Sequence, residues 1–131
     1  MITEEMIPGM QGALPSVLAT VDESGAPNVS YISQVFYVDD RHVALSNQFF
    51  NKSMRNINSN GIATVNVVRP DNLKSWYLEL KYKESKTDGE LFENMKMQLD
   101  AIASMSGMED VFKLRASEIF EVTKVDEVIM S

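Results

Sequence analysis

The stretch SNQFFNKSMRNI, residues 46–57, is typical of a strand end, a short polar turn and the first turns of a helix. Asn51 suits the N-cap position, because its side-chain oxygen can accept from a free backbone N–H two or three residues later. Lys52 and Ser53 then fall in the first turn, where unpaired N–H groups and the helix dipole attract anions. The stretch predicts a phosphate-binding turn, and the alternative is a capped surface helix with a solvated lysine.

The charge distribution sets this turn apart from the rest of the sequence. Residues 1–40 contain six acids and no Lys or Arg, and residues 41–70 contain four bases and no acid. Residues 71–131 contain thirteen acids and eight bases, which brings the total to the net charge of −7. The turn therefore lies in the positively charged third of the sequence, and this favours an anionic ligand there.

Length and composition indicate a single domain covering residues 1–131. Hydrophobic residues make up 44% of the chain, enough for a core without cross-links. The absence of cysteine excludes disulfides, thiolate nucleophiles and zinc–thiolate sites. Neither a signal peptide nor an apolar run of membrane-spanning length is present, so we expect a cytoplasmic protein. The acidic balance argues against nucleic acid and anionic membranes as partners.

Apolar, β-branched runs separated by turn residues predict a series of strands. These runs cover residues 14–21, 28–38, 43–47, 62–68, 76–83 and 117–125. The run over 28–38 is apolar on both faces, which predicts a barrel wall that another layer covers. The alternation of Trp76, Leu78 and Leu80 with polar neighbours predicts a strand with one core face and one wet face.

Three helices are expected between these strands. Thr3-Glu4-Glu5-Met6 is typical of a short capped helix, and a second helix follows Asn51. Thr87-Asp88-Gly89-Glu90 has the form of a capping box before a Met-rich helix that Gly107 ends. We interpret its Met-rich face as core packing. The order β-β-β-α-β-β-α-β predicts a mainly β protein (β+α), an antiparallel barrel with flanking helices.

The sequence offers few groups for acid–base or metal chemistry. His42 is the single histidine, beside a turn, with no ligand partner at useful spacing. We interpret Glu118 and Glu121 as part of a solvated strand face, so we expect no catalytic side chain and no metal site. A protein with an anion-binding turn but without such groups suggests that a bound cofactor supplies the reactivity.

Two segments resemble the FMN-binding split barrels, the pyridoxamine 5′-phosphate oxidase-like superfamily. Leu18-Ala19-Thr20-Val21-Asp22-Glu23-Ser24-Gly25-Ala26-Pro27-Asn28-Val29 is similar to the first hairpin of that fold. The later part is similar in its order of Val43-Ala44-Leu45-Ser46-Asn47, Asn51-Lys52-Ser53 and Asn56. The resemblance covers residues 10–126, and it is strongest to small members described as predicted flavin-nucleotide-binding proteins.

The resemblance implies a six-stranded antiparallel split β-barrel that forms a homodimer with FMN at the subunit interface. It places Lys52, Ser53 and Asn51 at the FMN phosphate, and Ser46 and Asn47 near the ribityl chain. It also implies that Ser30, Tyr31 and Ile32 border the flavin ring through backbone groups. Each of these residues has a purely structural alternative, such as a satisfied barrel-wall hydroxyl for Ser30 and core packing for Tyr31 and Ile32.

The chain departs from the true oxidase in two places. Phe50 and Asn51 stand where the larger oxidases carry Ser and Arg, and only Lys52 is kept. The C-terminal Arg-x-His substrate motif has no counterpart, because Ala116 and Ser117 follow Arg115. We therefore do not expect oxidation of vitamin B6.

Two hypotheses about function follow from the resemblance. The first is an FMN-dependent oxidoreductase that moves electrons between a nicotinamide or other small donor and a small acceptor. The second is a non-catalytic module for FMN storage, delivery or redox sensing. A split barrel that uses haem or a deazaflavin remains a third alternative.

Overall fold

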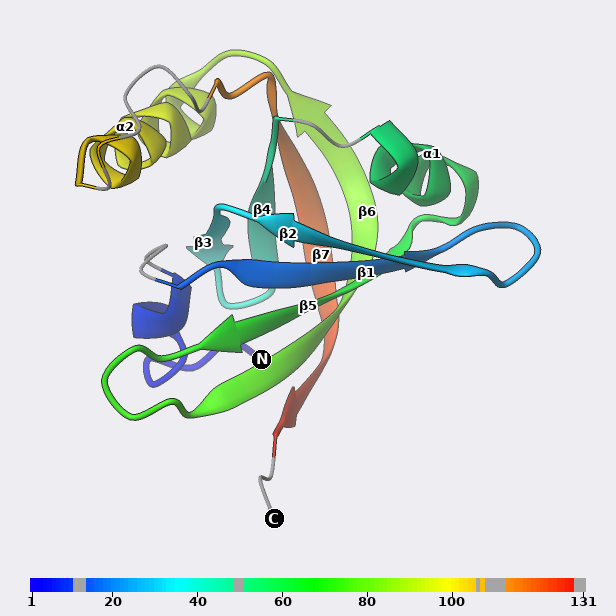
Figure 1. The fold of residues 1–131 in the computed structure, drawn as a ribbon, viewed down its shortest axis with the longest axis horizontal. Helices are drawn as coiled ribbons and strands as arrows, with labels where there is room; N and C mark the ends of the chain where they lie inside the picture. Colours follow the sequence, from blue (N-terminus) through cyan, green and yellow to red (C-terminus); the bar gives the residue numbers. More distant parts are fainter. Residues whose placement is uncertain (11–13, 49–50, 106, 108–112, 129–131) are drawn as a thin grey trace.

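The computed structural model describes residues 1–10, 14–48, 51–105, 107 and 113–128. In these residues, one seven-stranded sheet is accompanied by two α-helices and a short 3₁₀ helix (Figure 1). The elements are η1 (Ile7–Met10), β1 (Ser16–Val21), β2 (Pro27–Ile32), β3 (Val35–Asp39), β4 (His42–Asn47), α1 (Asn51–Asn60), β5 (Ile62–Val68), β6 (Ser75–Lys86), α2 (Glu90–Met105) and β7 (Ala116–Glu127).

The sheet closes into a barrel because of one very short connection. The strand order is β2-β1-β5-β6-β7-β4-β3, and neighbouring strands are antiparallel, so β2 and β3 form opposite edges. Only Ser33 and Gln34 separate these strands along the chain. Such a link spans at most about 11 Å, so the sheet curls until its edges approach each other. The result is an antiparallel split β-barrel with flanking helices, as the sequence predicts.

The strand count is seven rather than the expected six. The predicted strand over residues 28–38 breaks at Ser33, so that β2 pairs with β1 while β3 pairs with β4. Gln34 is 1% exposed and donates through Nε2 to the Met95 carbonyl of α2 at 3.2 Å. Gln34 is thus bonded to α2 at the point where the chain passes from β2, at one edge of the sheet, to β3, at the other edge.

The barrel core is continuous from the N-terminal segment to α1. Leu18, Val43, Val65, Leu78 and Phe120 are fully buried inside the barrel. The N-terminal segment adds Ile2, Met6 and Met10, and α1 adds Ile57. Residues 4–6 form a turn rather than the predicted helix, with the Met6 amide donating to the Thr3 carbonyl at 3.0 Å. Pro8 then lies inside the 3₁₀ helix η1.

Helix α2 packs through Met95, Leu99 and Ala103, which are its buried residues and belong to the predicted packing face. The methionines do not all take part as expected, because Met97 and Met105 are 69% and 88% exposed. The Thr87 capping box does not form, because the helix begins at Glu90 and the Gly89 carbonyl accepts the amide of Glu93. The described helices include none that is long and apolar enough to cross a membrane.

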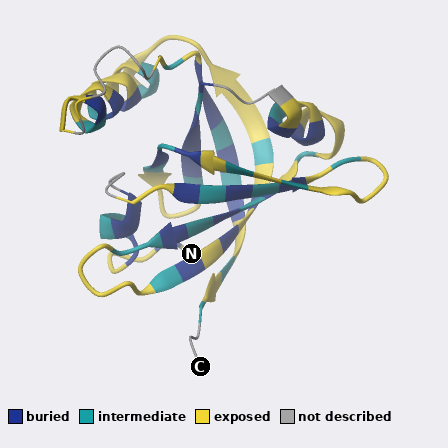
Figure 2. Ribbon diagram, viewed as in Figure 1, coloured by how far each residue is buried: buried dark blue, intermediate teal, exposed yellow. Residues whose placement is uncertain are grey.

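Strand β2 is not buried on both faces, contrary to the expectation for residues 28–38. Its outward side chains Val29 and Tyr31 are 65% and 77% exposed, whereas Ile32 is buried (Figure 2). The outer face of the sheet therefore carries large apolar side chains that no element of this chain covers in the described structure.

Gly9 brings the N-terminal segment into close contact with β5. A Cβ atom at Gly9 would lie 2.6 Å from Val67 Cγ1 and 3.1 Å from the backbone of Val68. We predict that Gly9→Ala lowers the free energy of unfolding by about 1–3 kcal/mol, because the segment must shift away from the core. Urea denaturation measures the change, with the exposed Asn94→Ala in α2 as control. Equal stability of the two variants would contradict this close approach.

Candidate cofactor site

Helix α1 is attached to strands β1 and β2 by a cluster of neutral polar side chains. Ser53 is 3% exposed, and its Oγ accepts from Asn28 Nδ2 at 3.1 Å. The same oxygen shares a hydrogen bond of 3.1 Å with Ser30 Oγ. One turn later, Asn56 Nδ2 donates to Thr20 Oγ1 at 3.1 Å. These bonds fix the start of α1 against the edge strand β2.

The predicted residues Ser30 and Ser53 are thus brought together, and Asn28 joins them. Asn28 belongs to the hairpin segment that resembles the family, but the sequence alone assigned it no role. Its position two residues before Ser30 in a strand was the available signal, because such residues share a face.

The first two turns of α1 present two cations, Lys52 and Arg55, beside a surface depression. Lys52 and Arg55 are exposed, and they line a depression of about 450 Å³ between α1 and the β1–β2 turn. Neither residue forms an ion pair within the described parts of the chain. The first turn contains no acid. An anion in this depression would meet both cations on the side of α1.

Asp22 and Glu23 form the opposite wall of the depression. Asp22 accepts from the Ser24 hydroxyl at 2.7 Å and from the amides of Ser24 and Ala26, each at 2.9 Å. These bonds, led by the Ser24 hydroxyl, hold the pKa of Asp22 below its ordinary 3.8, with a small contribution from the charge of Lys52. The Asp22 carboxylate is thus engaged by its own turn and keeps its negative charge, so the depression has an acidic wall opposite the wall formed by Lys52 and Arg55.

Ser46 and Asn47 end β4 with their side chains on opposite faces of the strand. Ser46 is paired in register with Ser117, is 1% exposed, and its Oγ has no hydrogen-bond partner. Asn47 instead donates through Nδ2 to Glu118 Oε2 at 3.1 Å. The two predicted ribityl-binding side chains therefore cannot contact one ligand from the same face of the strand.

Glu118 is buried, although the sequence pattern places it on a solvated face. It is 2% exposed, and its Oε1 accepts from the Tyr82 hydroxyl at 3.3 Å. Glu121, three residues later, does lie at the surface and pairs with Lys83 at 3.2 Å. The irregular pairing of β6 with β7 near Tyr82, where the register shifts, is not visible in the sequence.

The three β2 residues predicted to border a flavin ring take different positions. Ser30 bonds to Ser53, Ile32 is 4% exposed in the core, and Tyr31 points outward. Because β2 is an edge strand, its outer backbone N–H and C=O groups have no neighbouring strand. Backbone contacts of the predicted kind are available at this edge.

Asn51 is the first residue of α1, and its predicted capping side chain lies outside the described residues. His42 is not part of the cluster around α1. Its Nδ1 forms a hydrogen bond of 2.8 Å with Asp39 in the β3–β4 turn. Within the described residues, no group of three or more acids or histidines is placed to hold a metal ion.

The donor set around α1 and β4 fits a phosphorylated, hydroxyl-bearing cofactor. Lys52 and Arg55 supply charge for a phosphate, and the unpartnered Ser46 Oγ is a buried polar atom without a protein partner. Barrel, edge strand and the cations of α1 together define a split-barrel protein with a candidate cofactor site. A model of the pyridoxamine 5′-phosphate oxidase family matches residues 2–123. The chain belongs to this family.

Solved structures of three other proteins show the same fold. An FMN-binding protein from Syntrophomonas wolfei subsp. wolfei has a TM-score of 0.78 at 20% identity, over 97% of this chain and 86% of that chain. An F420 reductase has a TM-score of 0.69 at 16% identity, over 95% and 98%. HutZ, the haem storage protein from Vibrio cholerae, has a TM-score of 0.58 at 18% identity, over 97% and 95%. No curated protein sequence matches this chain.

Ser53→Ala tests the attachment of α1 to β2. The substitution leaves Asn28 Nδ2 and the Ser30 hydroxyl without their shared partner, so we predict a loss of about 1–2 kcal/mol in the free energy of unfolding. Ser59→Ala, in the same helix, removes only an exposed bond to Glu23 and serves as the control. Urea denaturation compares the two. A loss no greater than that of the control would refute the attachment.

Tyr82 gives a pH-dependent test of the Glu118 cluster. Burial, followed by the charge of Glu118, raises the pKa of Tyr82 above its ordinary 10.0. The folded state then binds more protons than the unfolded state above that pH, so stability falls as the pH rises. We predict a steeper fall between about pH 9 and 11 in the wild type than in Tyr82→Phe, measured by urea denaturation. Parallel curves would argue against this environment.

Proposed function

We propose that this protein binds FMN at the junction of α1, β2 and β4 and acts as an FMN-dependent oxidoreductase. The observation that carries the proposal is the pair of cations, Lys52 and Arg55, that lines one depression between α1 and the β1–β2 turn without an ion pair in the described structure. Membership of the pyridoxamine 5′-phosphate oxidase family supports it, as does the likeness to an FMN-binding protein.

The residues at the start of α1 would hold the phosphate in different ways. Lys52 and Arg55 offer charge, whereas the Ser53 hydroxyl is already engaged by Asn28 and Ser30. Ser53 therefore contributes through its backbone N–H, which has no intrahelical partner at this position. Its side chain keeps that N–H in place by tying the helix to β2.

The bound cofactor supplies electron transfer between a nicotinamide or other small donor and a small acceptor. The chain's own residues bind and orient it. Asn47 at the end of β4 provides a side-chain amide for the ribityl chain, whereas Ser46 lies on the opposite face of the strand and does not share that contact. The free backbone edge of β2 provides hydrogen-bonding groups for the flavin ring.

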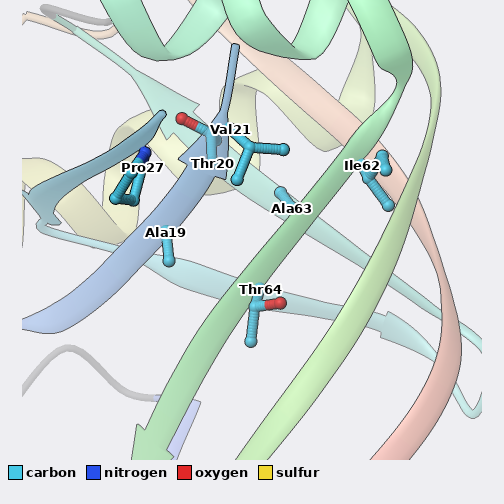
Figure 3. Close-up of a pocket in the computed structure, with 7 residues that line it drawn as sticks. All are labelled: Ala19, Thr20, Val21, Pro27, Ile62, Ala63 and Thr64. Carbon is cyan, nitrogen blue, oxygen red and sulfur yellow. The ribbon is translucent and has the colours of Figure 1, made fainter. Parts of the chain in front are cut away.

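A second copy of this chain is the proposed cover of the exposed sheet face. Val21 on β1, Val29 and Tyr31 on β2, Ile62 on β5 and Tyr77 on β6 share this face in the strand register, and each is at least 37% exposed. A hollow of about 230 Å³ lies among them where β1, β5 and the start of β2 meet (Figure 3). Several large apolar side chains exposed on one face favour an interaction site there. A homodimer would bring the partner chain to the β2 edge, where the flavin ring is proposed.

A non-catalytic role in FMN storage, delivery or redox sensing is the second candidate. It is favoured by the chemistry of the cluster at the helix start, because Asn28, Ser30 and Ser53 bond to one another and include neither acid nor base. Steady-state assay with NADH or NADPH and a generic acceptor separates the two roles. Turnover no faster than that of free FMN supports the non-catalytic role. The absorption spectrum of the native pigment distinguishes FMN from haem or a deazaflavin.

Titration of the purified protein with FMN tests the proposal. We expect saturable quenching of flavin fluorescence, and a dissociation constant about tenfold higher for Lys52→Ala because one charged phosphate contact is lost. Lys96→Ala, an exposed lysine on α2, is the matched control and should bind like the wild type. Absence of saturable binding in the wild type would refute FMN binding, and equal affinity of Lys52→Ala would refute the phosphate role.

A further inference from the structure

The carboxylate of Glu118 is a buried charge-bearing group without a role in the site described above. It lies on the barrel side of β7, next in register to Leu45 of β4 and two residues before Phe120. Its two oxygens accept from two neutral donors, Asn47 Nδ2 at 3.1 Å and the Tyr82 hydroxyl at 3.3 Å. No Lys, Arg or His forms an ion pair with it in the parts of the chain that the structure describes.

A carboxylate in this position is costly compared with an apolar residue of similar size. Removing it from water is unfavourable, and neutral donors offset only part of that cost. The side chains of Phe120 and Val122 on the same face of β7 show that apolar residues fill this wall elsewhere. The presence of the carboxylate therefore needs an explanation other than stability.

Glu118 determines which way the amide of Asn47 faces. A carboxylate oxygen accepts hydrogen bonds and donates none, so only the NH₂ side of the Asn47 amide can face Glu118. The backbone of Asn47 is held as well, since its carbonyl accepts from the Arg115 amide at 2.9 Å. Asn47 Oδ1 is then directed away from Glu118, as a fixed acceptor five residues before Lys52 at the end of β4.

We propose that Glu118 is a positioning residue that locks Asn47 with Oδ1 toward the cofactor site, where it accepts from a ligand hydroxyl. This inference rests on the proposed function and specifies it further, because the ribityl chain of FMN carries such hydroxyls. A fixed acceptor selects a ligand with an O–H group over one with only acceptors or methyl groups. The site thereby distinguishes flavins with a ribityl chain from those without one.

The test measures flavin affinity by fluorescence quenching, and folding by thermal denaturation. Glu118→Gln keeps the side-chain shape but can donate through Nε2, so the Asn47 amide can adopt either orientation. We expect its dissociation constants for FMN and riboflavin to rise about fivefold, while that for lumiflavin, which lacks the ribityl chain, stays within about twofold. Asn47→Ala should lose this contact completely. Adding Glu118→Gln to Asn47→Ala should then change FMN affinity no further.

Tyr82→Phe is the matched control for a general structural effect. It removes the other hydrogen bond to Glu118 and leaves the bond between Glu118 and Asn47 in place. We expect FMN affinity within about twofold of the wild type. If Tyr82→Phe weakens binding as much as Glu118→Gln does, the effect reflects packing and the proposal is overturned.

Two further outcomes would overturn the proposal. One is wild-type FMN affinity in Glu118→Gln, and the other is an equal loss on adding Glu118→Gln to the wild type and to Asn47→Ala. If Glu118→Gln does not fold, the side-chain amide resonance of Asn47 in the wild type decides, because it must shift on titration with riboflavin and stay unmoved with lumiflavin. Failure of the wild type to bind FMN would instead refute the proposed function itself.

Discussion

The two-residue link between β2 and β3 is the constraint on which this structure depends. Ser33 and Gln34 join strands that lie at opposite edges of one antiparallel sheet, so the sheet must curl until those edges approach each other. In the described residues β2 and β3 do not pair with each other, so the barrel is open between them and β2 keeps a free backbone edge. Helix α1 is attached beside this edge through Ser53, which places two exposed cations next to it.

Neutral and charged groups have separate tasks at the start of α1. Hydroxyl and amide side chains hold the helix in place, with Ser53 and Asn56 bonded to β2 and β1. Lys52 and Arg55 are left without ion pairs in the described residues, so they remain free to balance the charge of a ligand. In the proposed function the residues of the chain bind and orient a ligand, and this division agrees with a protein whose reactivity comes from a cofactor.

Periodicity and turn chemistry were sufficient to predict most of the fold. The alternation of Trp76, Leu78 and Leu80 predicted the inner face of β6, and Gly107 has the positive φ of 70° expected after a helix. The break at Ser33 was missed because both of its sides are β-branched or aromatic, and only the closure of the barrel forces the change of edge. The predicted capping box at Thr87 was wrong. Strand β6 extends to Lys86, and α2 begins only at Glu90, after Gly89, whose carbonyl accepts the first helical hydrogen bond from Glu93.

The candidate site was partly visible in the sequence, since Ser30 and Ser53 do meet. Alternation along β4 also places Ser46 and Asn47 on opposite faces. The burial of Glu118 beside Tyr82 instead depends on strand register, which periodicity does not supply. The most direct test of the central claim is the native mass of the purified protein incubated with FMN. We predict a dimer of the 14.7 kDa chain with one FMN per chain, whereas a monomer without bound FMN would contradict it.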